Sequence, residues 1–199
     1  MLCVPHAPRA RAAEIATVEM GRRRTGAASY FPTPRPGNQM SQPPSPEQFR
    51  DAMSVVPTAV TVVAATAGDA PAGATANAVA SLSLDPPLML ACLERSSRTL
   101  AVVRSSGRFS VNVLGAGDEA LGRSFASKAP LDEKWSGVEW SLAAGVPKLA
   151  AALVWIACDL RDLLDGGDHV IVTGAVAELE LAAHAAPLVF HHGVYRVIE

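Results

Sequence analysis

The stretch Gly73–Cys92 reads GATANAVASLSLDPPLMLAC, and the expected fold depends on it. Residues 70–84 contain no charged side chain. As one extended strand with a period of two, the stretch places Thr75, Asn77, Ser81 and Ser83 on one face and apolar side chains on the other. Side chains this small would let a flat ligand reach backbone N–H and C=O groups. The alternative is a hairpin of small residues packed in a barrel wall.

The segments around this stretch predict a mainly β chain. Asp85-Pro86-Pro87 forms a rigid corner, and a helix begins at Ser45-Pro46 and ends before Pro57. A second short helix follows Ser97 and ends at Gly107. Residues 126–148 are expected to be a loop, and Gly174 in the later strand 169–181 predicts a bend or bulge. Apolar and β-branched runs predict about seven strands, spaced as in a barrel with two or three short helices, at residues 59–65, 88–93, 109–114, 152–160, 169–181, 187–190 and 194–198.

Charge divides the 199 residues into two parts. Residues 1–40 carry six arginines and two glutamates, whereas residues 41–199 carry 11 basic and 17 acidic side chains. We therefore expect a basic leader over residues 1–46, disordered or loosely ordered, and one domain over residues 47–199. The leader could be a mitochondrial-type targeting peptide, an arm that touches nucleic acid, or an artefact if Met40 is the true start.

The remaining composition argues against several classes of protein. The net charge of −2 gives no general reason to expect nucleic-acid binding. No apolar run approaches 18 residues, so no membrane span is expected. The cysteines Cys3, Cys92 and Cys158 are odd in number and widely spaced, which favours reduced thiols over a disulfide framework. No Cys/His spacing matches a zinc signature, so no metal site is expected.

A glycine pair at Gly115-x-Gly117 resembles the start of a dinucleotide fingerprint. Asp118 would place a carboxylate where the pyrophosphate should lie, and no second strand supplies a ribose-binding acid. We therefore interpret the pair as a turn and Asp118 as a helix cap.

Taken together, the separate motifs resemble the flavin reductase family. T-x-N followed by S-x-S-L-D-P-P-L occupies residues 75–88, and G-x-F-x-V-N-V-L occupies residues 107–114. Between and after them come the shorter matches Ser97-x-Thr99, Phe125-Ala126, Gly145-x-Pro147-x-Leu149, Gly167-Asp168-His169 and Pro187-Leu188…Gly193-x-Tyr195. Each match is weak alone, but their shared order and spacing extend from about residue 49 to the C-terminus.

This resemblance implies an FMN-binding split β-barrel. The implied activity is hydride transfer from NADH or NADPH to FMN or FAD, with reduced flavin passed to a partner monooxygenase. It also implies a homodimer in the cytoplasm. The rival interpretations are a flavin- or haem-binding protein without reductase activity, and an oxidase of the pyridoxamine phosphate type. The oxidase would require a cluster of basic side chains, and residues 166–199 offer only Arg196.

The resemblance also assigns flavin-binding residues. Thr75, Ala76 and Asn77 would meet the edge of the ring, partly through the backbone. Hydroxyls of Ser81, Ser83 and the Ser97–Thr99 turn would hold the ribityl chain and phosphate, while Arg98 or Lys134 would balance the phosphate charge, or Arg98 would lie in solvent. The implied set is completed by Ala78, Leu82, Pro86, Phe125 and Ala126. Relatives often carry Ser and Phe where this chain has Ala78 and Val79, so one hydroxyl contact is missing.

Three further side chains have two interpretations each. His169 would donate a hydrogen bond to the nicotinamide carboxamide, or it would close a turn with Asp168. Tyr195 would cover the ring or pack in the barrel. Trp135 would cap the site from a loop or serve as an exposed apolar anchor.

Overall fold

The computed structural model describes residues 43–68, 70–182 and 186–198. Residues Pro44–Glu199 form one compact unit. The predicted leader lies almost wholly outside the described residues, and its nature stays a prediction. Among the described residues, no helix is long and apolar enough to cross a membrane.

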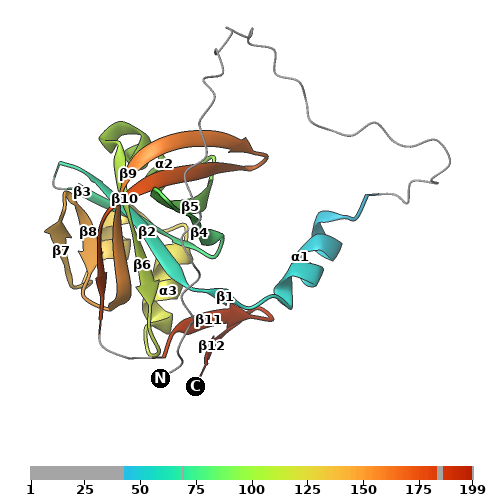
Figure 1. Cartoon of the computed structure of the whole chain (residues 1–199). Helices are drawn as coiled ribbons and strands as arrows, with labels where there is room; N and C mark the ends of the chain where they lie inside the picture. The colour runs from blue at the N-terminus through green and yellow to red at the C-terminus, as the bar shows by residue number, and fades with distance from the viewer. Residues whose placement is uncertain (1–42, 69, 183–185, 199) are drawn as a thin grey trace, which may run out of the picture. The chain divides into compact units, whose positions relative to one another are not determined.

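Seven antiparallel strands make up the main sheet, in the order β3-β2-β6-β9-β10-β5-β4 (Figure 1). The sheet curls until its two edges approach each other, because only Asn77 and Ala78 connect β3 at one edge to β4 at the other. A nearly closed sheet protects its edge strands from pairing with other chains. The strands are β2 (Thr61–Ala67), β3 (Ala70–Ala76), β4 (Val79–Leu84), β5 (Pro87–Glu94), β6 (Arg108–Leu114), β9 (Ala152–Gly166) and β10 (His169–Leu181).

Helix α2 (Arg98–Ser106) fills one end of this barrel. Its buried Leu100 and Val103 pack with Phe109 among side chains from six of the strands. The predicted start and end of the helix are confirmed. Ser97 Oγ accepts from the Leu100 amide at 3.4 Å, and Gly107 ends the helix with φ 69°.

A second core lies on the outer side of β2. Because side chains alternate along a strand, Val63 and Ala65 face the barrel interior, whereas Val62 and Ala64 face this second core. Helix α3 (Glu119–Ala126) contributes Phe125 to it. The prediction of a loop over residues 126–148 was wrong, because the segment holds α4 (Leu131–Trp135), β7 (Trp140–Ala143) and β8 (Val146–Leu149). These elements are too short to show a periodicity.

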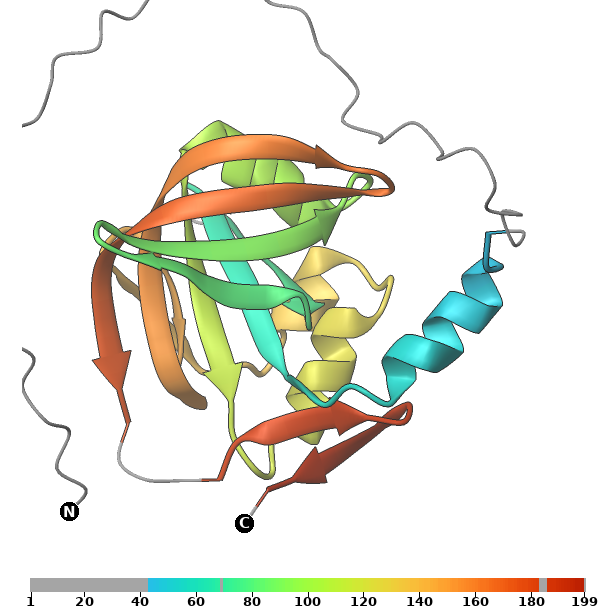
Figure 2. The same ribbon diagram turned by 45° about the vertical axis from the view of Figure 1, so that its right-hand side comes forward.

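The first strand of this unit pairs with its last two strands in a small separate sheet. Strand β11 (Leu188–His191) lies between β1 (Thr58–Ala59) and β12 (Val194–Val197). Helix α1 (Pro46–Ser54) precedes β1, and Ser45 and Gln48 form a capping box at its start. None of its residues is buried, and Figure 2 shows it standing away from the barrel.

The expectation of one extended ribbon over residues 73–84 was wrong. The chain bends at Asn77–Ala78 and passes from β3, at one edge of the sheet, to β4, at the other. Strand β4 also has a register shift between Ser81 and Ser83. A bulge adds one residue and so breaks the alternation of faces, which is why the four polar side chains share no face. Asp85 and Pro86 do form the predicted turn into β5.

Two smaller predictions have definite outcomes. Gly174 lies at a register shift in β10, as predicted. A Cβ there would stand 2.6 Å from the Phe109 ring. Asp118 does precede α3, but its carboxylate makes no cap bond to that helix. It accepts instead from the Gly115 amide at 3.1 Å, which holds the glycine turn in shape.

Candidate functional site

A cavity of about 490 Å³ opens where the end of β3, the end of β5 and the start of α2 meet helices α3 and α4. This volume is in the range of small-molecule sites. Twelve of the sixteen residues predicted to bind cofactor line it: Thr75, Ala76, Asn77, Ala78, Ser97, Arg98, Thr99, Phe125, Ala126, Lys134, His169 and Tyr195. Sequence segments up to 120 residues apart therefore contribute to one site.

The wall formed by β3 is smooth because its side chains are small. Thr75 Oγ1 donates to the Gly122 carbonyl at 2.7 Å, which fixes β3 against α3. A Cβ on Gly73 would stand 2.6 Å from the Phe125 ring, so only glycine allows this approach. Beyond β3, the exposed Asn77 brings an amide group to the cavity. The wall combines a flat surface with a polar edge, as a planar ring would require.

Positive charge gathers at another part of the cavity. The Lys134 side chain is almost fully buried, with 6% of the residue exposed, and its Nζ donates to the Phe125 carbonyl at 3.0 Å. Burial lowers the pKa of Lys134, and nearby Arg98 and Lys128 lower it further. A bound anion would offset the charge of the buried Lys134, so this part of the cavity suits a phosphate.

The Arg98 guanidinium is exposed and makes backbone contacts that the sequence did not predict, while its role toward the phosphate stays a prediction. Its Nη2 donates to the Lys128 and Ala129 carbonyls in the segment between α3 and α4. In the same segment, Lys128 Nζ pairs with the Glu94 carboxylate at 2.6 Å, and this pairing lowers the pKa of Glu94. The cavity rim is thus tied from β5 and α2 to the α3–α4 connection.

His169 begins β10 and lies opposite Glu94 of β5. Its Nδ1 lies 2.8 Å from Asp168 Oδ1, and this contact lowers the pKa of Asp168. In a neutral imidazole, an Nδ1–H that donates to Asp168 leaves Nε2 as an acceptor. A neutral His169 would therefore accept a hydrogen bond from a carboxamide NH₂, rather than donate one. The predicted contact with Asp168 is present, and His169 also lines the cavity, so its role toward the carboxamide stays a prediction.

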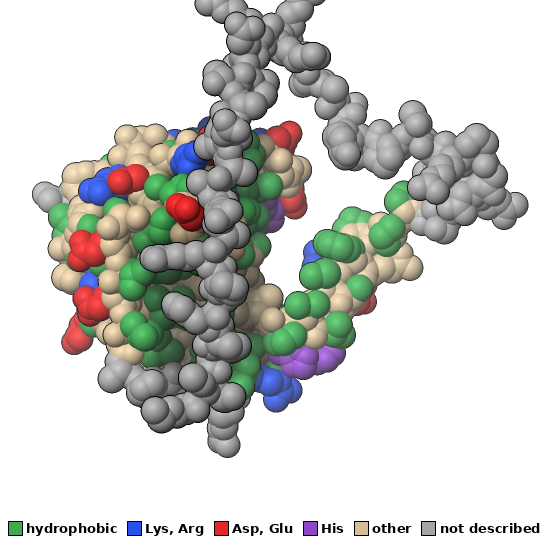
Figure 3. Space-filling model, in the orientation of Figure 1, with side chains coloured by type: hydrophobic (Ala, Val, Ile, Leu, Met, Phe, Trp, Pro, Cys, Tyr) green, Lys and Arg blue, Asp and Glu red, His purple; other side chains and the backbone are tan. Residues whose placement is uncertain are grey.

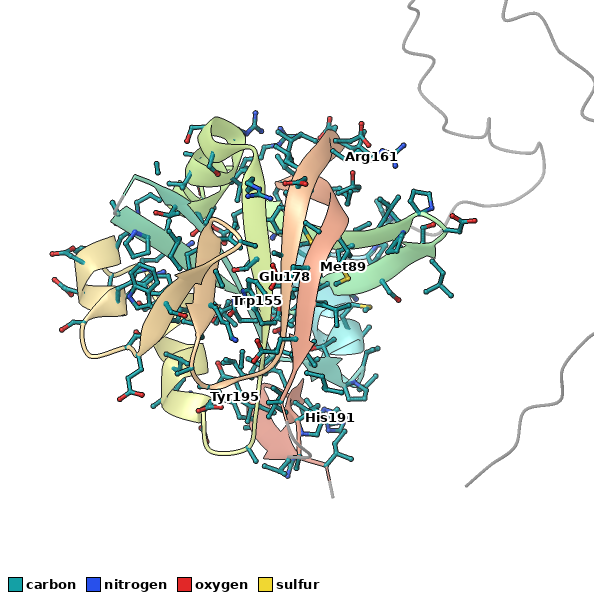
Figure 4. The ribbon with its side chains drawn as sticks, turned by 60° about the vertical axis from the view of Figure 1, so that its left-hand side comes forward. Met89, Trp155, Arg161, Glu178, His191 and Tyr195 are labelled. Carbon is teal, nitrogen blue, oxygen red and sulfur yellow. The ribbon has the colours of Figure 1, made fainter. Side chains whose placement is uncertain are left out.

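An aromatic wall closes another side of the cavity. Tyr195 of β12 and Phe190 of β11 stand edge to face with ring centroids 5.3 Å apart. Tyr195, labelled in Figure 4, is near α3, and the guanidinium of Arg123 lies 4.8 Å from its ring centre. Burial raises the pKa of the Tyr195 phenol. The residue both packs against α3 and lines the cavity, so its two predicted placements coexist.

Four predicted residues do not line this cavity: Ser81, Leu82, Ser83 and Pro86. They lie in β4 and the following turn, beyond the bend at Asn77 that separates the two strands. Their assignment to the flavin stays a prediction that the cavity does not support. Trp135 neither caps the site nor lies exposed. It is buried edge to face against Phe125, with centroids 4.9 Å apart, because α4 turns it inward.

The prediction missed several residues that line the cavity, chiefly Cys92, Glu94, Lys128 and Phe190. Cys92 alternates with the buried Ala91 and Leu93 in β5, so its position follows from strand period once the inward face is known. Lys128 and Glu94 are distant in sequence. Only the fold brings them together, and no local pattern marks them.

The flavin reductase like domain matches residues 53–199 of this chain. Among curated proteins, the reductase subunit HsaB of a flavin-dependent monooxygenase from Mycobacterium tuberculosis is 37% identical over 163 residues. That match covers 80% of this chain and 86% of HsaB. A "Probable flavin reductase" of Rhizobium meliloti is 40% identical over 137 residues, which are 68% of this chain but only 43% of that protein. The chain thus spans less than half the length of this second relative.

Solved structures agree with the fold. The NADH:FAD oxidoreductase SgcE6 of Streptomyces globisporus C-1027 superimposes with a TM-score of 0.74 at 32% identity, over 82% of this chain and 99% of SgcE6. The comparisons confirm the predicted split barrel and the predicted class of activity, an NAD(P)H-dependent flavin reductase that uses FMN or FAD. This chain belongs to the flavin reductase like domain family.

Proposed function

We propose that hydride passes from nicotinamide to flavin within the cavity between β3, β5 and α3. The observation that carries this proposal is the arrangement of its walls. A smooth backbone surface at β3 lies in the same cavity as a buried ammonium, that of Lys134. An isoalloxazine ring needs the first, and its ribityl phosphate needs the second. When bound, the two nucleotides supply the redox chemistry, and the protein aligns them and excludes water.

The ring edge would meet the backbone of Thr75–Asn77. Because the Thr75 hydroxyl already donates to Gly122, its backbone and the Asn77 amide are the groups left for the ring. Ser97 and Thr99 at the start of α2, together with Lys134, would hold the phosphate. His169 would receive the nicotinamide carboxamide at Nε2, and Tyr195 would limit access of water from the side of β12.

We further propose that the chain works as a homodimer. Large apolar side chains remain exposed on α1 and β4, namely Phe49 (60%), Met53 (48%), Leu82 (48%) and Leu84 (89%). Figure 3 shows hydrophobic side chains along α1. A two-fold dimer would cover such a surface with the same surface of a second copy. Light scattering on wild type and Leu84→Glu tests this: we expect a dimer that the added charge weakens, and a monomeric wild type would contradict it.

The expected recipient of reduced flavin is a separate monooxygenase component, because the relative HsaB is named as the reductase subunit of a flavin-dependent monooxygenase. We place the chain in the cytoplasm, since its described thiols Cys92 and Cys158 are unpaired.

Steady-state kinetics test the site directly. Purified protein should oxidise NADH or NADPH in the presence of FMN, with saturation in both substrates. Lys134→Gln should raise KM for FMN about tenfold or more, because a charged hydrogen bond contributes about 1.5–3 kcal/mol and 1.4 kcal/mol is tenfold. The variant should leave turnover of riboflavin, which lacks the phosphate, unchanged.

Arg104→Gln is the matched control for Lys134→Gln. Arg104 is an exposed basic residue in the last turn of α2 and does not line the cavity. It should leave KM for FMN unchanged. Equal effects of Lys134→Gln on FMN and riboflavin would contradict the placement of the phosphate. An absence of turnover with FMN, FAD and riboflavin would contradict the enzymatic assignment for this chain.

A further inference from the structure

Two helices that line the cavity are joined by a single short connection. Helix α3 contributes Phe125 and Ala126, and α4 contributes Lys134. The connecting segment, residues 127–130, also begins α4, because the Lys134 amide donates to the Pro130 carbonyl at 3.1 Å. The position of this segment therefore determines the position of α4, the helix that carries Lys134.

The same segment is fastened to the opposite side of the cavity mouth. Nη2 of Arg98 donates to the Lys128 and Ala129 carbonyls. Its two N–H bonds lie fixed in the guanidinium plane, so one nitrogen can hold two adjacent carbonyls. The Lys128–Glu94 ion pair at 2.6 Å is a second tie, but its partners are 83% and 49% exposed. Arg98 is exposed as well, but it holds two successive backbone carbonyls of the segment, whereas the ion pair holds only the end of the Lys128 side chain. The Arg98 contacts are therefore the more direct restraint on the backbone of residues 127–130.

Lys134 depends on this restraint at both of its ends. Its backbone follows the segment, and its Nζ donates to the Phe125 carbonyl at the end of α3. An ammonium has three N–H donors, and Phe125 accepts from one of them. The others are available to a ligand only while α3 and α4 keep their spacing. In Arg98, by contrast, Nη2 already donates to two backbone carbonyls.

We propose that Arg98 is a positioning residue for the flavin phosphate, which it serves by holding residues 127–130 so that Lys134 faces the cavity. This inference rests on the proposed function, because it takes the Lys134 end of the cavity as the phosphate site. It assigns the direct charge contact to Lys134 and the placement of that contact to Arg98.

The test compares KM and kcat for FMN in wild type, Arg98→Ala, Arg98→Lys and Arg104→Ala. We expect Arg98→Ala to raise KM for FMN about tenfold with kcat within twofold, because hydride transfer occurs at the ring and not at the phosphate. Arg98→Lys should fail to restore KM, since its ammonium ends one bond short of Nη2. Arg104→Ala should match wild type. Thermal melts of each variant verify that the fold persists.

A double variant separates positioning from direct contact. If Arg98 acts through Lys134, adding Arg98→Ala to Lys134→Gln should change KM by less than twofold. A further tenfold rise in that background would mean that Arg98 touches the phosphate itself, and would overturn the proposal. Full rescue by Arg98→Lys, or an Arg98→Ala enzyme with wild-type KM, would overturn it as well. A wild type without flavin turnover would instead refute the proposed function.

Discussion

Strands β3 and β4 form the two halves of the small-residue run that ends at Leu84, and they differ in how deeply they are buried. Strand β3 lies between the barrel core and α3, with Gly73 and Ala76 buried, whereas β4 is exposed along most of its length. Strand β3 needs small residues because the Phe125 ring lies close to Gly73 and the Gly122 carbonyl of α3 accepts from Thr75. The other half tolerates small residues because little packs on them. Composition alone therefore does not identify a ligand surface, and the contacts around it do.

The largest expected difference comes from enlarging one small side chain on each strand. Gly73→Ala should destabilise the protein by about 1–3 kcal/mol, because its Cβ would lie 2.6 Å from the buried Phe125 ring and 3.1 Å from Trp135. Ala80→Val on exposed β4 should change stability by less than about 0.5 kcal/mol. Urea unfolding measures both. Similar midpoints for the two variants would show that β3 is not packed as described.

The sequence predicted the fold better than it predicted the site. Caps and long strands carry strong local signals, and so Ser97, Gly107 and the bounds of β10 were predicted correctly. The bend at Asn77 and the register shift in β4 were not, because a small apolar run looks the same in one strand or two. The family resemblance located Lys134 and His169, which line the cavity. Their neighbours Glu94 and Lys128 meet only through the fold, so no local pattern could reveal them.

A comparison of two thiols, Cys92 at the end of the stretch and Cys158 of β9, extends the argument to alkaline pH. Cys158 of β9 faces the barrel interior, where burial and nearby Asp159 raise its pKa from 9.0 to about 12. A raised folded pKa contributes stability that is present below pH 9 and is lost as pH rises toward 12. The loss should approach about 1.4 kcal/mol per pH unit in that window. Cys92 lines the cavity and is partly exposed, so its contribution to this loss of stability should be smaller.

Cys158→Ala measures this contribution. The variant should be less stable than wild type at pH 7 because it leaves a cavity, and the difference should shrink as pH rises above 9. Cys92→Ala should run nearly parallel to wild type. Native-state alkylation provides a second readout, in which Cys92 reacts and Cys158 is protected. A constant stability difference between wild type and Cys158→Ala from pH 7 to pH 11 would contradict the buried-thiol assignment.

The smallest expected effects come from single hydroxyl groups on the two halves. Thr75→Val keeps the shape of the side chain but removes its donation to Gly122 at 2.7 Å, so stability should fall by about 1 kcal/mol. Ser81→Ala removes a hydroxyl from an exposed position of β4 and should cost less than about 0.5 kcal/mol. The same pair distinguishes the halves in function. Thr75→Val loosens α3 from the cavity wall and should raise KM for FMN severalfold, whereas Ser81→Ala should leave it unchanged. If Ser81→Ala weakened FMN binding more than Thr75→Val did, the flavin would lie against β4, and the original single-ribbon placement of the ring would be the better description.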